Sequence, residues 1–235
     1  LGNAVIVNFE DDGSGAALAD TVINALFESS ELPNVSTGHA YFIASKLFLM
    51  HDPIEIADHV RHVLVTFGGA DPNGYTEQLL ALAVLPEFQH IHFRVVVGRA
   101  KQNAQELMAA SYPEHIEVIY DTQNMAELMS WADIAVTSRG RTGYELALMG
   151  VPFLSVAQNA REEKHTFLRE ENGVIYLGRQ PDREKLLRAL ERLVHSSAEE
   201  RKLLQQKLLS HNLRDGRQHV LQLIDDQCRK GGKQK

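Results

Sequence analysis

The chain has 235 residues, 44% hydrophobic and 23% charged, which is the composition of an ordinary globular protein with one large domain or two smaller ones. A formal net charge of −7 argues against a general nucleic-acid binder, and no apolar run approaches the roughly 20 residues of a transmembrane helix. Cys228 is the single cysteine, which excludes an internal disulfide and favours a reducing, cytoplasmic location.

The first part of the sequence predicts two short strands, at residues 4–9 and 20–24, then a polar, turn-rich stretch at 28–39 and a connection at 46–61. The first strand ends in Glu10, Asp11 and Asp12. Two adjacent aspartates after a strand could hold a metal, or they could cap a solvated turn, which is the simpler reading. Because the first residue is Leu1, we expect the sequence to be a fragment of a longer chain.

From residue 63 onward, strands and helices alternate, which is typical of βαβ units and a mostly parallel sheet. The expected strands are 63–67, 91–97, 116–120, 133–138, 151–157 and 174–177, and the expected helices are 75–85, 100–110, 125–131, 144–149 and 162–170. After Asp182 the pattern is helical, with leucines 186, 187, 190 and 193 on one face and 203, 204 and 208 on another. A frayed tail is expected at 230–235.

The first candidate site follows the strand at 63–67, where Gly68 and Gly69 remove side chains and Asn73-Gly74 closes the turn before a helix. Backbone N–H groups and the helix dipole would favour phosphate there. The alternative is a βα loop that needs glycine only in order to turn.

The second candidate site joins the strand at 133–138 to the next helix through Ser138, Arg139, Gly140, Arg141 and Thr142. Arginine supplies forked donors suited to phosphate. One turn later, Glu145 could accept both hydroxyls of a ribose, or it could be an ordinary surface carboxylate. The amides of Gln158-Asn159 should lie on the same sheet edge. The glycine turn is not the dinucleotide fingerprint, which argues against NAD or FAD.

Three motifs, VLVTFGGADPNGYT, TSRGRTGYELALMGVPFLSVAQN and Asp215-Gly216-Arg217, resemble the C-terminal half of the UDP-sugar hydrolase of pseudaminic acid biosynthesis. That family is related to MurG-type GT-B glycosyltransferases and to spore-coat polysaccharide proteins. Upstream, VIVNFEDD and ADTVIN are similar to the family's strand ending in paired aspartates and its next strand ending in Ile-Asn.

The resemblance implies an α/β, GT-B-like Rossmann domain with helices on both faces of a mostly parallel sheet, preceded by a partial N-terminal α/β unit. The implied divisions are a remnant and linker at 1–60, a nucleotide-sugar-binding domain at 61–197 and C-terminal helices at 198–235. The implied contacts are Gly68, Gly69, Ser138, Arg139, Gly140, Arg141 and Thr142 with the UDP phosphates, Ile119 and Tyr120 with uracil, Glu145 with the ribose, and Asn159 with the sugar. Ala160 departs from the family pattern, which has glutamine there.

The family's catalytic histidine lies in a G-x-G-H-x-x-R loop that this sequence lacks, since Gly38-His39 stands in a different context. The catalytic residue is therefore unknown, and an N-terminal domain is expected to be missing or replaced by a fused one. The hypotheses are a UDP-sugar hydrolase of surface-glycan synthesis, a glycosyltransferase, or a non-catalytic domain fused to a glycan-biosynthesis enzyme. The expected partner is a UDP-sugar, with no metal, cofactor or nucleic acid.

Overall fold

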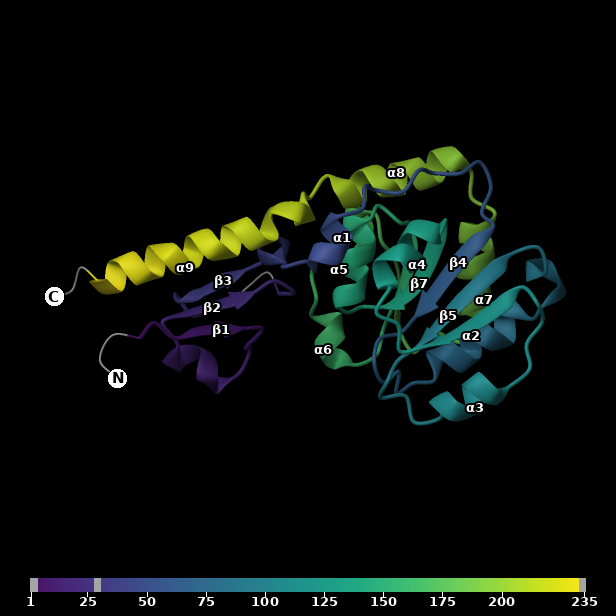
Figure 1. Cartoon of the computed structure of the whole chain (residues 1–235), viewed down its shortest axis with the longest axis horizontal. Helices are drawn as coiled ribbons and strands as arrows, with labels where there is room; N and C mark the ends of the chain where they lie inside the picture. The colour runs from purple at the N-terminus through teal and green to yellow at the C-terminus, as the bar shows by residue number, and fades with distance from the viewer. Residues whose placement is uncertain (1–3, 28–30, 233–235) are drawn as a thin grey trace.

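The computed structural model describes residues 4–27 and 31–232. They include two β-sheets, each built of parallel strands (Figure 1). The larger sheet has the order β6-β5-β4-β7-β8-β9. Its strands are β4 (His62–Thr66), β5 (His92–Val97), β6 (Ile116–Tyr120), β7 (Ile134–Ser138), β8 (Phe153–Ala157) and β9 (Ile175–Arg179). All residues of β7 and β8 are buried, as expected for parallel strands covered on both faces.

Helices cover both faces of this sheet, and each face has its own apolar core. One core joins the sheet to α2 (Tyr75–Ala83), α3 (Ala104–Ala109) and α7 (Arg183–Val194), and the other joins it to α4 (Met125–Trp131), α5 (Arg141–Leu148) and α8 (Ala198–Leu209). The prediction of an α/β fold with a mostly parallel sheet and helices on both faces is confirmed.

The smaller sheet has the order β1-β2-β3, formed by β1 (Val7–Phe9), β2 (Thr21–Asn24) and β3 (Val35–Thr37), and is followed by the short helix α1 (Lys46–Leu49). Phe42, which follows this sheet, stacks on Tyr144 of α5 with ring centroids 4.9 Å apart. This unit therefore shares a core with the larger sheet.

The long last helix, α9 (Gly216–Gly232), extends beyond the larger sheet and runs alongside the smaller one (Figure 1). Arg214 donates hydrogen bonds to the carbonyl oxygens of Leu49 and His51 just before this helix begins. A Cβ on Gly216 would lie 1.9 Å from the Phe42 carbonyl oxygen, so only glycine fits where the helix meets the N-terminal unit.

Several predicted elements differ from the structure. The stretch at 28–39 contains strand β3, although 28–30 lie outside the described residues. The predicted helix at 162–170 is wrong, because only α6 (Ala160–Glu163) and a single 3-10 turn at Glu170–Asn172 form. Leu203 is 60% exposed and does not pack with its neighbours. Helix α9 continues to Gly232, so the backbone at 230–232 is helical, and 233–235 are not described.

None of the helices in the described ranges is both long and apolar enough to cross a bilayer.

Candidate functional site

The strand order places a topological switch point between β4 and β7. From β4 the chain proceeds outward to β5 and β6, whereas β7, β8 and β9 follow on the other side. The two central strands pair in parallel, with Thr66 opposite Thr137, so the loops that follow them start side by side. Ligands of open α/β sheets bind outside the carboxyl ends of the strands at such a point.

The two predicted glycine loops meet at Ser138, the last residue of β7. A Cβ on Gly68 would lie 3.9 Å from the Ser138 hydroxyl oxygen, and a Cβ on Gly140 would lie 3.6 Å from it. A Cβ on Gly69 would meet no atom within 4 Å, so this glycine faces open space. The structure thus brings Gly68, Ser138 and Gly140 together next to the open space at Gly69, and this space is called the hollow below.

Helix α5 begins at this hollow. Gly140 is its N-cap residue, and Arg141, Thr142 and Gly143 form its first turn, three residues earlier than predicted. Within the described residues, the backbone N–H groups of Gly140, Arg141 and Thr142 donate no hydrogen bond. Unpaired N–H groups at a helix N-terminus are donors for an anion.

Two carboxyl groups lie beside this helix start. An oxygen of Glu162 would be 3.9 Å from a Cβ on Gly140, while its other carboxylate oxygen accepts a hydrogen bond from Gln158 N at 2.8 Å. Burial raises the pKa of Glu162 despite that hydrogen bond. On α5 itself, burial raises the pKa of Glu145 to about 7, and only the nearby charge of Arg141 opposes the shift. The Glu145 carboxyl accepts no hydrogen bond from any described residue.

The structure does not support a phosphate-binding side chain at Arg139. Its side chain is 4% exposed and donates to the carbonyl oxygens of His165, at 2.6 and 3.1 Å, and of Leu168. The His165 ring in turn donates from Nδ1 to the Arg139 carbonyl oxygen at 2.5 Å. Arg139 and His165 therefore hold the 165–168 loop, and the Arg139 guanidinium is occupied by backbone carbonyl oxygens.

Arg141 is also directed away from the hollow. Its guanidinium donates to the Ile43 carbonyl oxygen at 3.0 Å, lies 3.9 Å from a Glu10 carboxylate oxygen and covers the Phe42 ring. The prediction of a phosphate-binding side chain is thus not supported for Arg141, whose side chain instead joins α5 to the N-terminal unit. Its backbone N–H remains at the open end of α5.

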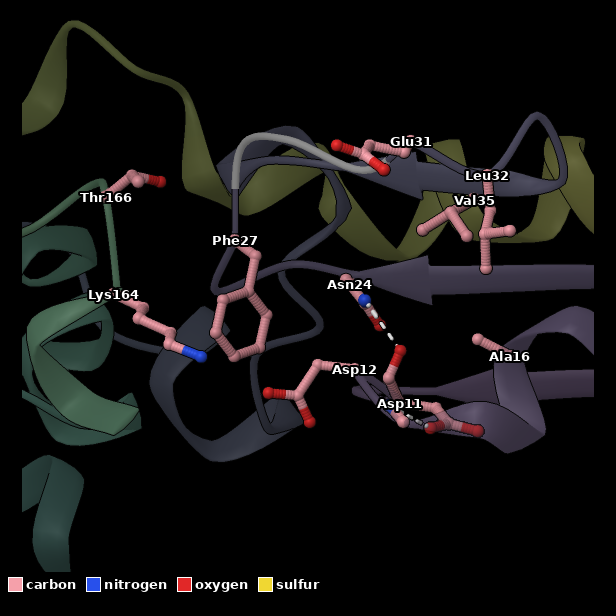
Figure 2. Close-up of a pocket in the computed structure, with 11 residues that line it drawn as sticks. Asp11, Asp12, Ala16, Asn24, Phe27, Glu31, Leu32, Val35, Lys164 and Thr166 are labelled. Carbon is pink, nitrogen blue, oxygen red and sulfur yellow. Dashed lines mark hydrogen bonds between the residues drawn. The ribbon is translucent and has the colours of Figure 1, made fainter. Parts of the chain in front are cut away.

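The acidic turn after β1 lies in a separate cavity of about 640 Å³ between the N-terminal unit and the loop after α6 (Figure 2). Asp11 accepts hydrogen bonds from Gly13 N at 2.9 Å and Asn8 Nδ2 at 3.1 Å, so it closes the turn. Asp12 lies 3.7 Å from Arg161. Within residues 4–27 and 31–232 no group of histidine, cysteine, aspartate and glutamate side chains could hold a metal ion.

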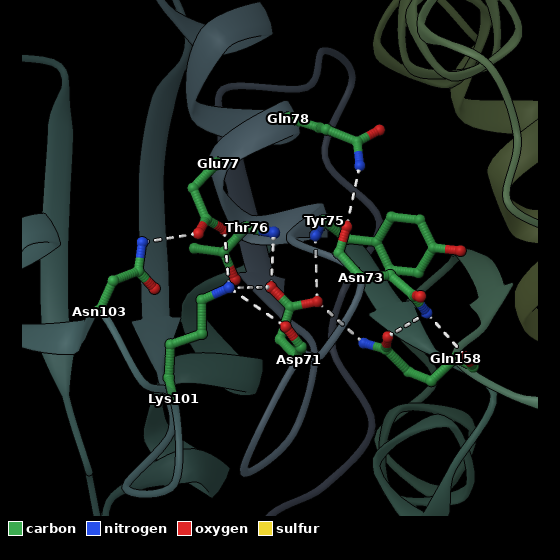
Figure 3. Close-up of polar contacts among 9 residues, drawn as sticks. All are labelled: Asp71, Asn73, Tyr75, Thr76, Glu77, Gln78, Lys101, Asn103 and Gln158. Carbon is green, nitrogen blue, oxygen red and sulfur yellow. Dashed lines mark hydrogen bonds and ion pairs between the residues drawn. The ribbon is translucent and has the colours of Figure 1, made fainter.

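The start of α2 differs from that of α5, because its N–H groups are already occupied (Figure 3). Asp71 accepts from Tyr75 N at 3.0 Å and from Thr76 N at 2.8 Å. Burial acts to raise the pKa of Asp71, but hydrogen bonds from Gln158, Thr76 and Tyr75 outweigh it and hold the pKa below its usual range. The predicted anion site at this helix is therefore filled by the chain's own carboxylate.

Sequence reasoning missed the network around Asp71 (Figure 3). Lys101, whose side chain is 6% exposed, lies 3.2 Å from Asp71 and 2.8 Å from Glu77. Gln158 donates to Asp71 at 3.0 Å and accepts from Asn73 at 2.8 Å, which ties the β8 loop to the β4 loop. No capping pattern in the sequence marked this aspartate, because the N-cap residue of α2 is Gly74 and Asp71 lies three residues before it.

The remaining predicted contacts lie at the same sheet edge but apart from the hollow. Ile119 and Tyr120 end β6, the edge strand, which β5 separates from β4. Tyr120 is 46% exposed. Asn159 is the N-cap residue of α6 and accepts from Glu162 N at 3.0 Å. Their roles toward uracil and sugar stay predictions.

No protein-family profile matches the chain. Over 168 residues it is 29% identical to the spore coat polysaccharide biosynthesis protein SpsG of Bacillus subtilis, covering 66% of this chain and 49% of SpsG. Over 160 residues it is 29% identical to an uncharacterised protein of Methanocaldococcus jannaschii, covering 60% of this chain and 33% of that protein. The chain thus spans at most about half the length of these relatives.

Among solved structures, MurG of Acinetobacter baumannii superposes with a TM-score of 0.60 at 21% identity, over 96% of this chain and 65% of that chain. A Staphylococcus aureus TarM mutant in complex with UDP and other ligands gives 0.62 at 11% identity, over 89% and 44%. The spinosyn rhamnosyltransferase SpnG, complexed with thymidine diphosphate, gives 0.55 at 13% identity, over 86% and 57%. These likenesses establish a GT-B-like fold, and the similarity to SpsG confirms the resemblance to spore-coat polysaccharide proteins.

Proposed function

We propose that this chain binds a UDP-sugar at the switch point between β4 and β7 and acts in glycan biosynthesis. One observation carries the proposal: Gly68 and Gly140 lie on either side of the Ser138 hydroxyl at the open N-terminus of α5, and Gly69 faces open space. Three glycines admit a bulky anion close to the backbone, and the free N–H groups and helix dipole would stabilise it.

In this proposal the diphosphate lies on Gly68, Gly69, Ser138 and the N–H groups of Gly140 to Thr142. Glu145 follows one turn later on α5, where its carboxylate would accept hydrogen bonds from the ribose hydroxyls. A carboxylate without a protein donor suits that role, because ribose would supply the hydrogen bonds that the protein does not. Ile119 and Tyr120 would contact the uracil and Asn159 the sugar.

The comparisons support a sugar nucleotide over other phosphate ligands. The relative SpsG is named for polysaccharide biosynthesis, and two proteins of the same fold were solved with UDP or thymidine diphosphate. Because these structures share little sequence with the chain, they support the class of ligand and not the base or the sugar.

The reaction we propose is transfer of the glycosyl group with UDP as leaving group. Negative charge develops on the diphosphate as the glycosidic bond breaks, and the N–H groups at the start of α5 are directed toward that charge. A hydrolase and a glycosyltransferase would share this donor site and differ in whether water or an acceptor hydroxyl attacks. The structural neighbours favour transfer to an acceptor, whereas the motif resemblance favours hydrolysis.

Calorimetric titration of the chain with UDP, and with CDP and GDP as controls, tests the proposal. Selective UDP binding is expected, and equal or absent binding of all three nucleotides would contradict it. Incubating a UDP-sugar with the full-length protein, with and without a saccharide acceptor, then separates the two reactions. UDP released without acceptor indicates hydrolysis, and release only with acceptor indicates transfer.

A further inference from the structure

A further cavity, of about 490 Å³, lies at the opposite edge of the larger sheet from the hollow. It is formed by the segment before β4, the turn before β5 and the end of α7, where the two strands begin next to each other (Figure 1). Its polar lining residues are His59, Arg61, His90, His195 and Ser196. The cavity is therefore lined by an arginine and three imidazole rings at the N-terminal ends of the strands.

The lining carries positive charge without a carboxylate to offset it. Arg61 is permanently charged, and no aspartate or glutamate is among the described residues that line the cavity. Other exposed arginines pair with carboxylates, as Arg99 does with Asp121 and Arg229 does with Asp225, each at 2.7 Å. Because the whole chain has a net charge of −7, a carboxylate-free cavity around an arginine departs from the rest of the surface and favours an anion.

The donor groups of this lining are not used within the protein. The side chains of His59, Arg61 and His90 form no hydrogen bond or ion pair with any described residue. Arg61 is held through its backbone alone, since its N–H donates to the Asp133 carboxylate at 2.8 Å and its carbonyl oxygen accepts from His92 N at 2.7 Å. The guanidinium is thus carried by a fixed backbone and is available to a ligand, and its forked donors suit phosphate.

The carboxylates that adjoin this segment interact with a different cation, Arg201 of α8. Its side chain is fully buried and donates to the carbonyl oxygens of Ala57 and Asp58 at 2.8 and 3.1 Å. Burial lowers the pKa of Arg201, and the charges of Asp133 and Asp58 oppose that shift. Arg201 therefore fixes the backbone that leads to His59 and offsets two negative charges that would otherwise repel an anion.

The residues at the end of α7 supply hydrogen-bond acceptors. His195 Nδ1 donates to the Glu191 carbonyl oxygen at 2.8 Å, so Nε2 of the neutral ring is an acceptor. The Ser196 hydroxyl donates to the Leu193 carbonyl oxygen at 2.6 Å, so its own oxygen can only accept. A ligand that satisfies both the donors and these acceptors must carry negative charge and a hydroxyl hydrogen. Hydrogen phosphate has both, whereas sulfate has only the charge.

We infer that this cavity binds a phosphate group that also offers a hydroxyl, either inorganic hydrogen phosphate or the phosphomonoester of a small polyol. Arg61 is the charged donor, with His59 and His90 as further donors. Ser196 and His195 are the acceptors that select phosphate over sulfate. The volume lies within the roughly 300–1,000 Å³ of small-molecule sites. Because the cavity is at the other edge of the sheet, the inference does not depend on the proposed function.

Calorimetric titration of the chain with inorganic phosphate, glycerol 3-phosphate and sulfate tests the inference, at neutral pH and constant ionic strength and with UDP present to occupy the hollow. We expect phosphate to bind about tenfold tighter than sulfate, and Arg61→Gln to weaken phosphate about tenfold. Arg183→Gln is the matched control. It removes an exposed arginine at the first residue of α7, which is roughly 18 Å long, and should leave the phosphate affinity unchanged.

The acceptor argument has its own variant, Ser196→Ala. It removes the hydroxyl oxygen, while the bond from Ser196 N to the Leu193 carbonyl oxygen remains, so the end of α7 should be kept. This variant should reduce the preference for phosphate over sulfate about threefold. Equal affinity of the wild-type chain for phosphate and sulfate, or equal effects of Arg61→Gln and Arg183→Gln, would overturn the inference.

NMR of the histidine rings locates the bound anion and does not need UDP. Phosphate should shift the signals of His59, His90 and His195, and should leave His115, which lines a different cavity, unchanged. These shifts without UDP binding would contradict the proposed function alone, and UDP binding without these shifts would contradict the inference alone. Tighter binding of glycerol 3-phosphate than of inorganic phosphate would assign the site to a phosphomonoester, and the reverse order would assign it to the free ion.

Discussion

Helices α2 and α5 both start at the switch point, but they differ in what accepts hydrogen bonds from their first backbone N–H groups. Each follows a central strand, and each begins with backbone N–H groups that need acceptors. In α2 the Asp71 carboxylate accepts from Tyr75 and Thr76, so the helix start is filled from within. In α5 the first N–H groups have no acceptor among the described residues, and glycines clear the space before them.

This difference shows that a glycine loop before a helix is an anion site only where the chain leaves it unfilled. At α2 the Asp71 carboxylate accepts hydrogen bonds from the helix N–H groups and provides the negative charge there, and Lys101 and Gln158 hold it in place. At α5 the first N–H groups have no acceptor among the described residues and their residues are not buried, so water or a ligand can bind them. Substitutions at the start of α2 should therefore change the stability of the fold, and substitutions at the start of α5 should change ligand affinity.

The largest effect is expected when the Asp71 carboxylate is removed from the start of α2. Asp71→Ala would leave the buried Lys101 with Glu77 as its ion-pair partner and two helix N–H groups without an acceptor. We expect a loss of about 3–5 kcal/mol in the free energy of unfolding, measured by urea denaturation. Glu77→Gln is the control, because the Glu77 side chain is 36% exposed and should contribute less. A loss below about 1 kcal/mol for Asp71→Ala would contradict a structural role.

The second prediction concerns Glu145, on the open helix. Its pKa of about 7 exceeds the ordinary 4.5, so the folded protein keeps a proton there that the unfolded chain releases. Stability therefore falls as pH rises between these values, and Glu145→Gln should stabilise the fold by about 3 kcal/mol at pH 8 and not at pH 4. The same variant should weaken UDP about tenfold. Equal stability changes at both pH values would contradict burial of the charge, and unchanged affinity would remove the ribose role.

Third, Gly69→Val should separate binding from folding. A Cβ on residue 69 would meet no atom within 4 Å, so the fold should tolerate a side chain there, while the hollow would be narrowed. We expect a loss of UDP affinity of about tenfold or more with an unchanged melting temperature. Ala70→Val is the matched control, because residue 70 lines the cavity beside Lys101 instead. Equal effects of the two variants would mean that the first loop does not contact the phosphates.

The smallest effect is expected at Glu162, whose carboxylate lies beside the open helix start. Removing a like charge near the diphosphate with Glu162→Gln should tighten UDP roughly threefold. Glu163→Gln is the control, because Glu163 faces Arg179 at 3.5 Å. Weaker UDP binding by Glu162→Gln would show that the hydrogen bond from Gln158 N to the Glu162 carboxylate affects UDP affinity more than the negative charge of Glu162 does.

Much of the fold could be predicted because its signals are local. The apolar runs of β4, β6 and β7 and the helical pattern at 125–131 can be recognised from the residues of each segment alone. Strand β3 was missed because three residues within a polar stretch carry no periodic signal, and only pairing with β2 makes them a strand. The helix expected at 162–170 was wrong because His165 and Leu168 supply carbonyl oxygens to Arg139, a distant partner.

The candidate site shows the same limit. The sequence identified which loops converge, since the strand pattern sets the sheet edge. It could not identify which groups remain free, because that depends on contacts between residues far apart in the chain. Arg139 is 26 residues from its partner His165, and Asp71 is 87 residues from Gln158. A charged loop residue can thus be proposed to bind a ligand only until its partner within the protein is known.

The contact between the last helix and the N-terminal unit has a consequence for how the protein is made. Residues 40–51 are held by Arg214, Gly216 and His219, and the bond from Arg214 to Leu49 spans 165 residues. At the usual rate of synthesis, that interval is roughly 10–30 s. The N-terminal unit therefore leaves the ribosome well before the residues that complete it, and over that time its sheet edge and apolar face must be kept from wrong partners.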